Sequence, residues 1–378
     1  MSVKHRGAHE GEPLSAGTAL TRRDFLRGCA AIGASGLLAW GATGCTASSH
    51  RGAGSAGDTA VMGSAGLSAA SAPAELRIGY FQSPNAELLV KGRGDLQKAL
   101  PRTKVSYVMF DAGRDILVAM ASSSIDIATI GMPPGVLGMT DGLPYKIYYL
   151  HDIIGPSEAL VAKKGSGIDA VGDLRGHTVA TAFGTTAHYA LLEAMKHAGV
   201  VQDELTLLDM TGPDIIAAWQ RGDIDATYVW QPAQANLIAQ GGKVVTDSAR
   251  VARQTGSVTG EFGIARTAYA QSYPGVLKTY IDVLDKATGD YRTLDVDTVG
   301  TLAKELEMTD DAAAQIAGQI DVLDAAQQRA YFGDADKRGK LAGLLKRTND
   351  YLYRQSSVTE RKTAEFFDSM LLKGLYAG

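Results

Sequence analysis

The stretch IIAAWQRGDIDATYVWQP, residues 215–232, combines two kinds of periodicity. Ile215 and Trp219 are spaced for one face of a helix, and Gly222 follows where helices commonly end in a left-handed residue. The run 226–230 is rich in β-branched and aromatic residues, which favours a short buried strand. The stretch therefore predicts the end of an amphipathic helix, a tight turn and a strand.

The same helix–turn–strand pattern occurs a second time in the chain. Residues 113–133, GRDILVAMASSSIDIATIGMP, align with residues 212–232 at a constant offset of 99. Asp126 of the first copy matches Asp225 of the second, and an isoleucine precedes each of them. Such a repeat indicates two lobes, each holding one copy of the same local structure.

The ends of the two repeated strands are candidates for a ligand site. Ligands of open α/β sheets bind beyond the carboxyl ends of the strands. Those ends are Gly131 in the first copy and Trp230 in the second. We expect these two residues to face each other across a cleft.

Strand and helix patterns alternate along most of the chain after residue 75. Strands are expected at residues 76–81, 104–110, 125–130, 145–151, 157–163, 177–181, 205–209, 226–230, 244–246 and 262–266. Helices are expected at residues 86–100, 113–122, from 133, 185–198, 233–240, 275–293, 296–307, 309–320, 324–332, 336–355 and 359–375. This order predicts an α/β fold with parallel or mixed sheets covered by helices, followed by a helical C-terminal tail.

Composition limits the possible classes of function. The net charge of −4 includes no basic cluster, so we expect no nucleic-acid partner. No two histidines have the spacing of metal ligands on one helix face. The chain also has no G-x-S-x-G, H-E-x-x-H or P-loop sequence. We therefore expect no enzyme, no bound metal and no cofactor.

The N-terminal segment has the features of an export signal. Arg22 and Arg23 precede a weakly apolar, glycine-rich run at 28–40, a pattern that resembles a twin-arginine signal. That run is too short to span a bilayer core of about 30 Å. Three small residues precede Cys45, as at a lipoprotein processing site where the thiol is acylated. We expect residues 1–45 to be a twin-arginine lipoprotein signal with lipid attached at Cys45.

The segment that follows has no means of building a core. Residues 46–74 consist mainly of serine, glycine and alanine. Such a composition buries too little apolar surface to fold, and it favours a flexible tether. We expect an exported protein held by a lipid anchor on the extracytoplasmic side of the cell membrane.

Four stretches of the chain resemble a known family, the periplasmic substrate-binding proteins of ABC importers for taurine and alkanesulfonates. The taurine-binding component is the most similar member. The stretches are residues 157–164, 185–200, 215–230 and 242–248. The resemblance extends from about residue 76 to about residue 266 and fades over the helical tail.

The resemblance implies a two-lobed periplasmic-binding-protein fold of the type II kind. Lobe one would comprise residues 75–156 and 263–378, and lobe two would comprise residues 157–262 with the crossover strands. The family implies a monomer that captures a small organosulfonate between its lobes and delivers it to an ABC permease.

A sulfonate is a fully ionised anion, so its site needs hydrogen-bond donors and positive potential. Thr185 and Thr186 precede a predicted helix, and they offer backbone N–H groups and two hydroxyls. The resemblance places this segment, with His188 in the first helical turn, at the ligand. The structural alternatives are plain N-capping for the threonines and a structural role for the histidine.

An ammonium group needs a carboxylate or an aromatic face. Trp230, Tyr80 and Phe81 are aromatic residues at strand ends, whereas Trp219 on the helix is expected in the core. Glu261 stands where the taurine-binding family has an aspartate that pairs with the ligand amine. The other candidate ligand contacts are Gln82, Met132 and Glu158.

One departure from the family leaves the ligand open. The family has Gly-Ser-Ser-Pro where this chain has Gly131-Met132-Pro133-Pro134, so two hydroxyls are missing and Pro133 has no N–H group to donate. Taurine, a longer alkanesulfonate, another small zwitterion and a pyrimidine precursor all remain possible solutes. A membrane-tethered ligand sensor is the alternative to a transport role.

Overall fold

The computed structural model describes residues 72–376 of the chain. The predicted signal at 1–45, its Cys45, and residues 46–71 of the predicted tether lie outside the described residues. Within residues 72–376, no helix combines the length and apolar character that crossing a membrane requires.

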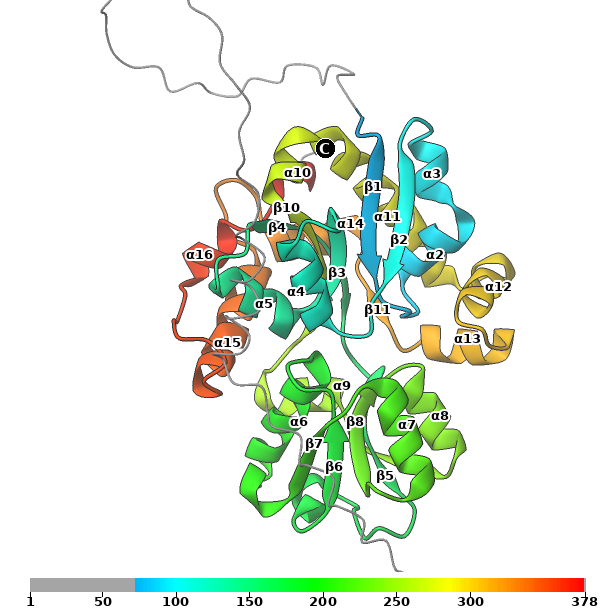
Figure 1. Cartoon of the computed structure of the whole chain (residues 1–378), viewed down its shortest axis with the longest axis vertical. Coiled ribbons are helices and arrows are strands. Elements are labelled where there is room, and N and C mark those ends of the chain that lie inside the picture. Colours follow the sequence, from blue (N-terminus) through cyan, green and yellow to red (C-terminus); the bar gives the residue numbers. More distant parts are fainter. Residues whose placement is uncertain (1–71, 377–378) are drawn as a thin grey trace, which may run out of the picture. The chain divides into compact units, whose positions relative to one another are not determined.

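Six strands form the first sheet, in the order β11-β4-β10-β3-β1-β2 (Figure 1). The strands are β1 (Glu75–Tyr80), β2 (Lys104–Met109), β3 (Ile127–Gly131), β4 (Tyr145–Ile153), β10 (Gly260–Arg266) and β11 (Asp321–Val322). The strands β2, β1 and β3 are parallel, and β10 lies antiparallel between β3 and β4.

Five strands form the second sheet, in the order β7-β6-β8-β5-β9. The strands are β5 (Glu158–Lys163), β6 (Thr178–Thr181), β7 (Thr206–Asp209), β8 (Ala226–Trp230) and β9 (Gly242–Asp247). Here β5 is the antiparallel strand, between β8 and β9. Both sheets therefore share one order, in which three parallel strands (β2-β1-β3 and β7-β6-β8) are followed by an antiparallel strand (β10 and β5) and then by β4 or β9, and the predicted α/β fold is confirmed.

The helices lie largely where the sequence predicts them. They are α2 (Ala86–Arg93), α3 (Asp95–Ala99), α4 (Gly113–Ala121), α5 (Met132–Thr140), α6 (Thr186–His197), α7 (Gly212–Arg221), α8 (Ala233–Ala239), α9 (Ser248–Thr255), α10 (Thr267–Ser272), α11 (Pro274–Thr293), α12 (Val296–Glu305), α13 (Asp310–Ala317), α14 (Ala325–Phe332), α15 (Lys340–Arg354) and α16 (Ala364–Asp368). Short 3₁₀ turns lie at Val171–Leu174, Gln202–Glu204 and Lys373–Tyr376.

Two predicted helices were wrong in detail, and the helices α9 and α10 were not predicted. The helix expected at 86–100 is broken at Gly94, whose φ of 68° ends α2 in a left-handed C-cap. The helix expected at 359–375 is reduced to the five residues of α16. The N-cap of α9 is Asp247, whose side chain accepts a hydrogen bond from the Arg250 N–H.

The two copies of the repeated unit make the same backbone contact. In the first sheet, Asp126 donates its N–H to the Arg77 carbonyl at 2.9 Å, and its Oδ2 accepts the Arg77 N–H at 3.0 Å. In the second sheet, Asp225 does the same with Thr178, at 2.8 and 2.9 Å. The predicted repeat is thus confirmed, because the aspartates fix the register of β3 against β1 in the first sheet and of β8 against β6 in the second.

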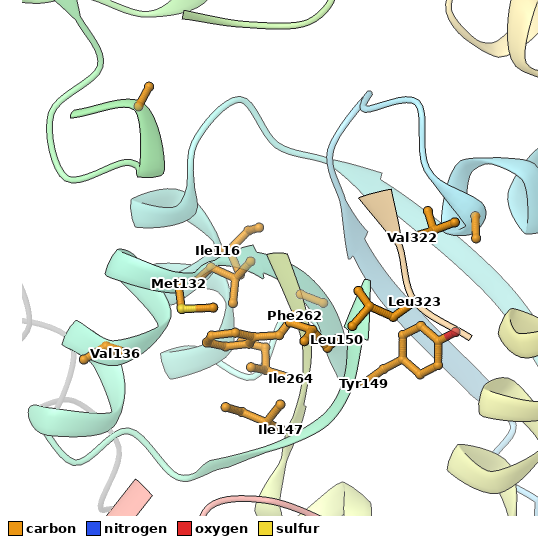
Figure 2. Packing of buried hydrophobic residues seen from close by; sticks show 14 of the residues in the cluster. Ile116, Met132, Val136, Ile147, Tyr149, Leu150, Phe262, Ile264, Val322 and Leu323 are labelled. Carbon is orange, nitrogen blue, oxygen red and sulfur yellow. The ribbon is translucent and has the colours of Figure 1, made fainter. Parts of the chain in front are cut away.

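The core of the first sheet is packed closely around β10. Figure 2 shows Phe262 of β10 beside Met132 of α5 and Ile116 of α4, and all three side chains are fully buried. The second sheet has its own cluster, in which Trp219 is buried together with Ile215. The prediction that Trp219 belongs to the core is confirmed.

Gly263 in β10 offers a test of this packing. A methyl group at this position would lie 2.4 Å from the Tyr148 ring, so either the strand or the ring must move. We expect Gly263→Ala to lower the free energy of unfolding by about 1–3 kcal/mol in urea titrations. Gly289→Ala is the control, since a Cβ at this exposed position of α11 meets no atom within 4 Å. It should be neutral or stabilising by up to about 1 kcal/mol, and equal effects of the two substitutions would contradict the packing described.

Candidate ligand-binding site

A cavity of about 260 Å³ lies at the carboxyl ends of strands from both sheets. The residues that follow or end these strands and line the cavity are Phe81 and Gln82 after β1, Phe110 after β2, Gly131 of β3 and Trp230 of β8. The two strand ends of the repeated unit therefore line the same cavity. A Cβ at Gly131 would lie 3.2 Å from Cγ2 of Thr186, so the small residue allows the close approach of α6 to β3.

The N-termini of several helices contribute to the wall of this cavity, namely those of α4, α6 and α7, and that of α8 through Pro232 and Ala233. The lining residues are Ala112 and Gly113 at α4, Thr185 and Thr186 at α6, and Gly212 and Pro213 at α7. The first N–H groups of a helix have no partner within the helix, and they carry partial positive charge. Such ends bind anions through hydrogen bonds from the backbone. Pro213 has no N–H group, so α7 offers fewer donors than α4 and α6.

Three carboxyl groups line the other part of the cavity, namely Asp152 of β4, Glu158 of β5 and Glu261 of β10. Glu261 lies directly opposite Asp152 in the β10–β4 pair and donates its backbone N–H to Asp152 Oδ1 at 3.1 Å. Like charges in such opposite positions repel each other. The Oε2 atom of Glu261 is buried, and it has no hydrogen-bond partner among the described residues.

Glu158 is held in place by two hydroxyl groups. Its Oε1 accepts a hydrogen bond from the Thr186 hydroxyl, and its Oε2 accepts one from the Ser248 hydroxyl at 3.4 Å. Thr186 lies in the first turn of α6, so this contact joins the carboxyl group to the helix N-terminus that lines the cavity. The acidic and the donor parts of the wall therefore meet at Thr186.

The three carboxyl groups resist ionisation. Burial raises the pKa of Asp152 to about 7 and that of Glu158 to about 8. Burial and the nearby charge of Asp152 raise the pKa of Glu261 well above its ordinary value. Among the described residues, no lysine, arginine or histidine lines the cavity, whereas Asp111 adds a fourth acid at an exposed position. The electrostatics of the site are therefore acidic, apart from the helix N-termini.

A second buried polar group lies in the first sheet beside this acidic region. Glu87 of α2 accepts hydrogen bonds from the Thr129 hydroxyl at 2.6 Å and the Tyr280 hydroxyl at 2.7 Å. His151 Nε2 lies 2.9 Å from the same Thr129 oxygen. Burial raises the pKa of Glu87 to about 7 and lowers the pKa of His151 to about 3. None of these four residues lines the cavity.

No metal site was found in this region. Across residues 72–376, no group of three or more histidine, cysteine, aspartate or glutamate side chains is placed to hold a metal ion.

Six of the predicted site residues line the cavity. They are Gln82, Glu158, Thr185, Thr186, Trp230 and Glu261. The Thr185 hydroxyl accepts the His188 N–H at 3.2 Å, so the N-capping role that the sequence left open is present. The Gln82 amide donates to the Glu305 carbonyl at 2.9 Å, which ties the loop after β1 to α12.

Met132 and Tyr80 do not line the cavity, which corrects their placement from the sequence. Met132 begins α5, and its side chain is buried in the core beside Phe262 (Figure 2). Tyr80 packs edge-on against Tyr107, with ring centroids 5.9 Å apart. Successive residues of a strand point to opposite faces, so Tyr80 and Phe81 cannot both face the cavity.

His188 also lies outside the cavity lining and has a structural environment. Its ring stacks on Phe183 at 4.5 Å, and its Nδ1 accepts the Gly184 N–H at 3.2 Å. Burial lowers the pKa of His188 to about 4, so the ring is neutral at physiological pH. The residue supports the turn that leads into α6, and it makes no direct contact with the cavity.

Asp152 is one of the cavity residues that the sequence analysis missed, and Phe110 and Asp111 after β2 are others. The predicted strand ended at His151, whereas β4 continues to Ile153 and pairs there with β10 and β11. A charged residue at the end of an otherwise apolar strand, close to a predicted crossover, was the available signal. The same signal identifies Glu158 at the start of β5.

Comparisons with known proteins agree with this geometry. Residues 103–292 match the family model described as "NMT1/THI5 like". A "Taurine-binding periplasmic protein" of Escherichia coli (strain K12) is 39% identical over 176 residues, which is 47% of this chain and only 54% of that protein. A "Putative aliphatic sulfonates-binding protein" of the same strain is 28% identical over 295 residues, covering 78% of this chain and 88% of that protein.

Solved structures show the same fold. The periplasmic aliphatic sulphonate binding protein SsuA from Escherichia coli has a TM-score of 0.64 and 25% identity, covering 78% of this chain and 92% of that chain. The desulfurization enzyme DszB is also similar in fold, with a TM-score of 0.58 and 17% identity over 80% of this chain and 98% of that chain. The matched family region spans half of the sequence, and the chain belongs to the NMT1/THI5-like family, with the fold of the periplasmic binding proteins.

Proposed function

We propose that this protein is the extracytoplasmic solute-binding component of an ABC importer, which captures a small organosulfonate such as taurine and delivers it to a permease. The observation that carries the proposal is the cavity at the strand ends of both sheets, with the N-termini of α4 and α6 in its wall. Relatives of this chain are named as taurine-binding and aliphatic sulfonates-binding proteins.

The two halves of the cavity suit the two ends of an aminosulfonate. The sulfonate would accept hydrogen bonds from the N–H groups at the starts of α4 and α6 and from the Thr185 and Thr186 hydroxyls. Trp230 would offer its ring to the aliphatic or ammonium part of the solute, and Glu261 would accept from the ammonium group. Gln82 and Glu158 would complete the contacts.

Capture would require two lobes that close on the solute. In this proposal, lobe one comprises residues 75–156 and 263–378, and lobe two comprises residues 157–262. One ion pair already joins the two, since Arg114 Nη1 of α4 lies 3.4 Å from Oδ2 of Asp209, the last residue of β7. This exposed pair contributes little stability by itself, so a solute that contacts both lobes can shift the population toward the closed form.

The proposed location follows from the N-terminal segment and from the relatives. Export by a twin-arginine signal at 1–45, a lipid on Cys45 and a tether at 46–74 would hold a monomeric binding protein close to its permease. The relatives whose names include the word periplasmic support an exported protein.

Binding rather than catalysis is the proposed activity. The chain's only cysteines are Cys29 and Cys45, so the described part of the chain has no thiol nucleophile. Similarity to an enzyme of the same fold, at 17% identity, concerns the fold alone.

A thermal-shift screen tests the proposed solute class. A solute that binds only the folded protein stabilises it by about 2.7 kcal/mol at 100 times its dissociation constant. We expect taurine to raise the melting temperature most, and the panel should include 1-propanesulfonate, glycine betaine, a pyrimidine precursor and nitrate. The buffer must contain no sulfonate, because MOPS and HEPES are themselves aminosulfonates. If no sulfonate raises the melting temperature while another solute does, the protein transports or senses a different ligand.

Trp230 provides a second test of the same site. We expect Trp230→Ala to weaken taurine binding by about 10- to 100-fold in calorimetry, because the aromatic face is lost, while the far-ultraviolet circular dichroism stays unchanged. Trp219→Phe is the matched control, since Trp219 is buried in the second sheet's core and does not line the cavity. It should alter stability but leave the affinity unchanged. Unaltered affinity in Trp230→Ala would remove this residue from the site.

A further inference from the structure

Three strands bring one carboxyl group each to the same cavity. Asp152 and Glu261 are cross-strand neighbours in the first sheet, and Glu158 lies in the second sheet opposite Trp230. All three line the cavity. Their separate origins in β4, β10 and β5 show that the acidic region is produced by the fold and not by a run of acidic sequence.

No positive side chain balances these groups. The remaining acid in the cavity lining is the exposed Asp111. Other titratable groups that interact electrostatically with the three carboxyls are Glu87 of α2, Tyr228 of β8, Tyr291 of α11 and Asp321 of β11. His151, which precedes Asp152 in β4, contacts Thr129 instead. The tyrosines are neutral because burial raises the pKa of each, and burial keeps His151 neutral by lowering its pKa. Within the described chain, no lysine or arginine lines the cavity.

Buried carboxylates without a counter-ion cannot all ionise. Each unpaired buried charge is costly, and adjacent acids raise one another's pKa and share protons. In the empty cavity the available counter-ion is therefore the proton. The Glu261 Oε2 atom, which is buried and without a partner among residues 72–376, marks the place where a donor from a ligand would be accepted.

We propose that Asp152, Glu158 and Glu261 share at least one proton while the cavity is empty, and exchange it for the cationic group of an organosulfonate that carries an amine. This inference rests on the proposed function. On binding, a carboxylic acid of the cluster becomes a carboxylate, its proton passes to the solvent, and the ligand ammonium takes the proton's place. Asp152 thereby becomes a specificity-determining residue, and a sulfonate without an amine is disfavoured at neutral pH.

The exchange predicts opposite pH dependences for two ligands of similar size. Taurine needs an ionised cluster, so its affinity should fall as the pH decreases through the pKa values of Asp152 and Glu158, about 7 and about 8. Between about pH 8.5 and pH 6, the affinity for taurine should fall tenfold or more if one proton is exchanged. 1-Propanesulfonate is repelled by the ionised cluster, so its affinity should rise over the same change.

Calorimetry on the full-length protein measures both effects. Titrations of taurine in phosphate and in Tris, which contain no sulfonate and differ in ionisation enthalpy, report the number of protons released. We expect about one proton at neutral pH. Taurine binding without proton release, or with an affinity that does not depend on pH, would overturn the inference while leaving the proposed function intact.

Glu261→Gln removes one acid with little change of shape. The substitution should lower the affinity for taurine by about tenfold or more at pH 8 and raise the affinity for 1-propanesulfonate. It should also reduce the number of protons released on taurine binding. Asp285→Asn is the matched control, because Asp285 of α11 also has a pKa raised by burial but does not line the cavity. It should leave both affinities unchanged. If Glu261→Gln behaves like this control, the cluster is not the cation site.

The melting temperature of the ligand-free protein distinguishes the proton-sharing cluster from the organosulfonate function. An acid whose pKa is raised by folding costs stability as the pH rises through that pKa. The melting temperature of the empty protein should therefore fall between about pH 6 and pH 9, and Glu261→Gln should reduce this fall. Suppose that this pH dependence is observed, that propylamine raises the melting temperature and that no sulfonate does. The organosulfonate function is then contradicted, whereas the proton-sharing cluster is supported. A pH-independent melting temperature in both proteins would overturn the cluster.

Discussion

The buried Asp126 carboxylate is the contact on which the first sheet depends. It accepts hydrogen bonds from the backbone N–H, Nε and Nη2 of Arg77 and from the Arg266 guanidinium, while its carbonyl accepts the Arg266 N–H. Burial opposes ionisation, yet these hydrogen bonds lower the pKa of Asp126 below its ordinary value. One side chain thus joins β1, β3 and β10, the central strands of the sheet. Asp225 makes the corresponding backbone contact in the second sheet. Since register is fixed at one end of the strands, the position of their other end is fixed as well, and that end borders the cavity.

The same register imposes a cost at the cavity. Holding β10 between β3 and β4 places Glu261 beside Gly131 on one side and Asp152 on the other. Two acids in opposite positions of a ladder destabilise it when both are ionised, because no cationic side chain among the residues lining the cavity pairs with either. The dense packing of Phe262, the next residue of β10, offsets this cost by burying a large apolar side chain completely. On the strand β10, a residue that stabilises the core (Phe262) therefore directly follows one that destabilises the fold (Glu261). Such unfavourable groups are common where a site needs side chains that folding alone would not favour.

The sequence was sufficient for the fold because the fold rests on periodicity and on a repeat. Both copies of the repeated unit, the alternation of strands and helices around them and the core position of Trp219 follow from spacing and residue type. The site was predicted less completely, since the direction of a side chain depends on where a strand or helix begins. Tyr80 and Phe81 differ by one residue and face opposite sides, and Met132 enters the core because α5 starts there. Asp152 was missed because β4 extends two residues further than its apolar pattern, through pairing with β10 and β11 that no local signal specifies.

The separation of donors and acids across the cavity has a consequence for closure under the proposed function. The partial charge at a helix N-terminus is about half an elementary charge, so α4 and α6 cannot neutralise a sulfonate as an arginine would. A ligand that carries its own positive charge completes the neutralisation of the sulfonate, provided that its cationic group also reaches the carboxyls. Donors and acids occur in both halves, since α4, Asp152 and Glu261 belong to the first sheet's half, whereas α6 and Glu158 belong to the second. A zwitterion can therefore contact the donors and the acids of both halves at once, while an anion alone contacts only the donors and a cation alone contacts only the acids. Because only differential contacts shift a conformational equilibrium, charge complementarity would select the solute and favour closure through the same set of interactions.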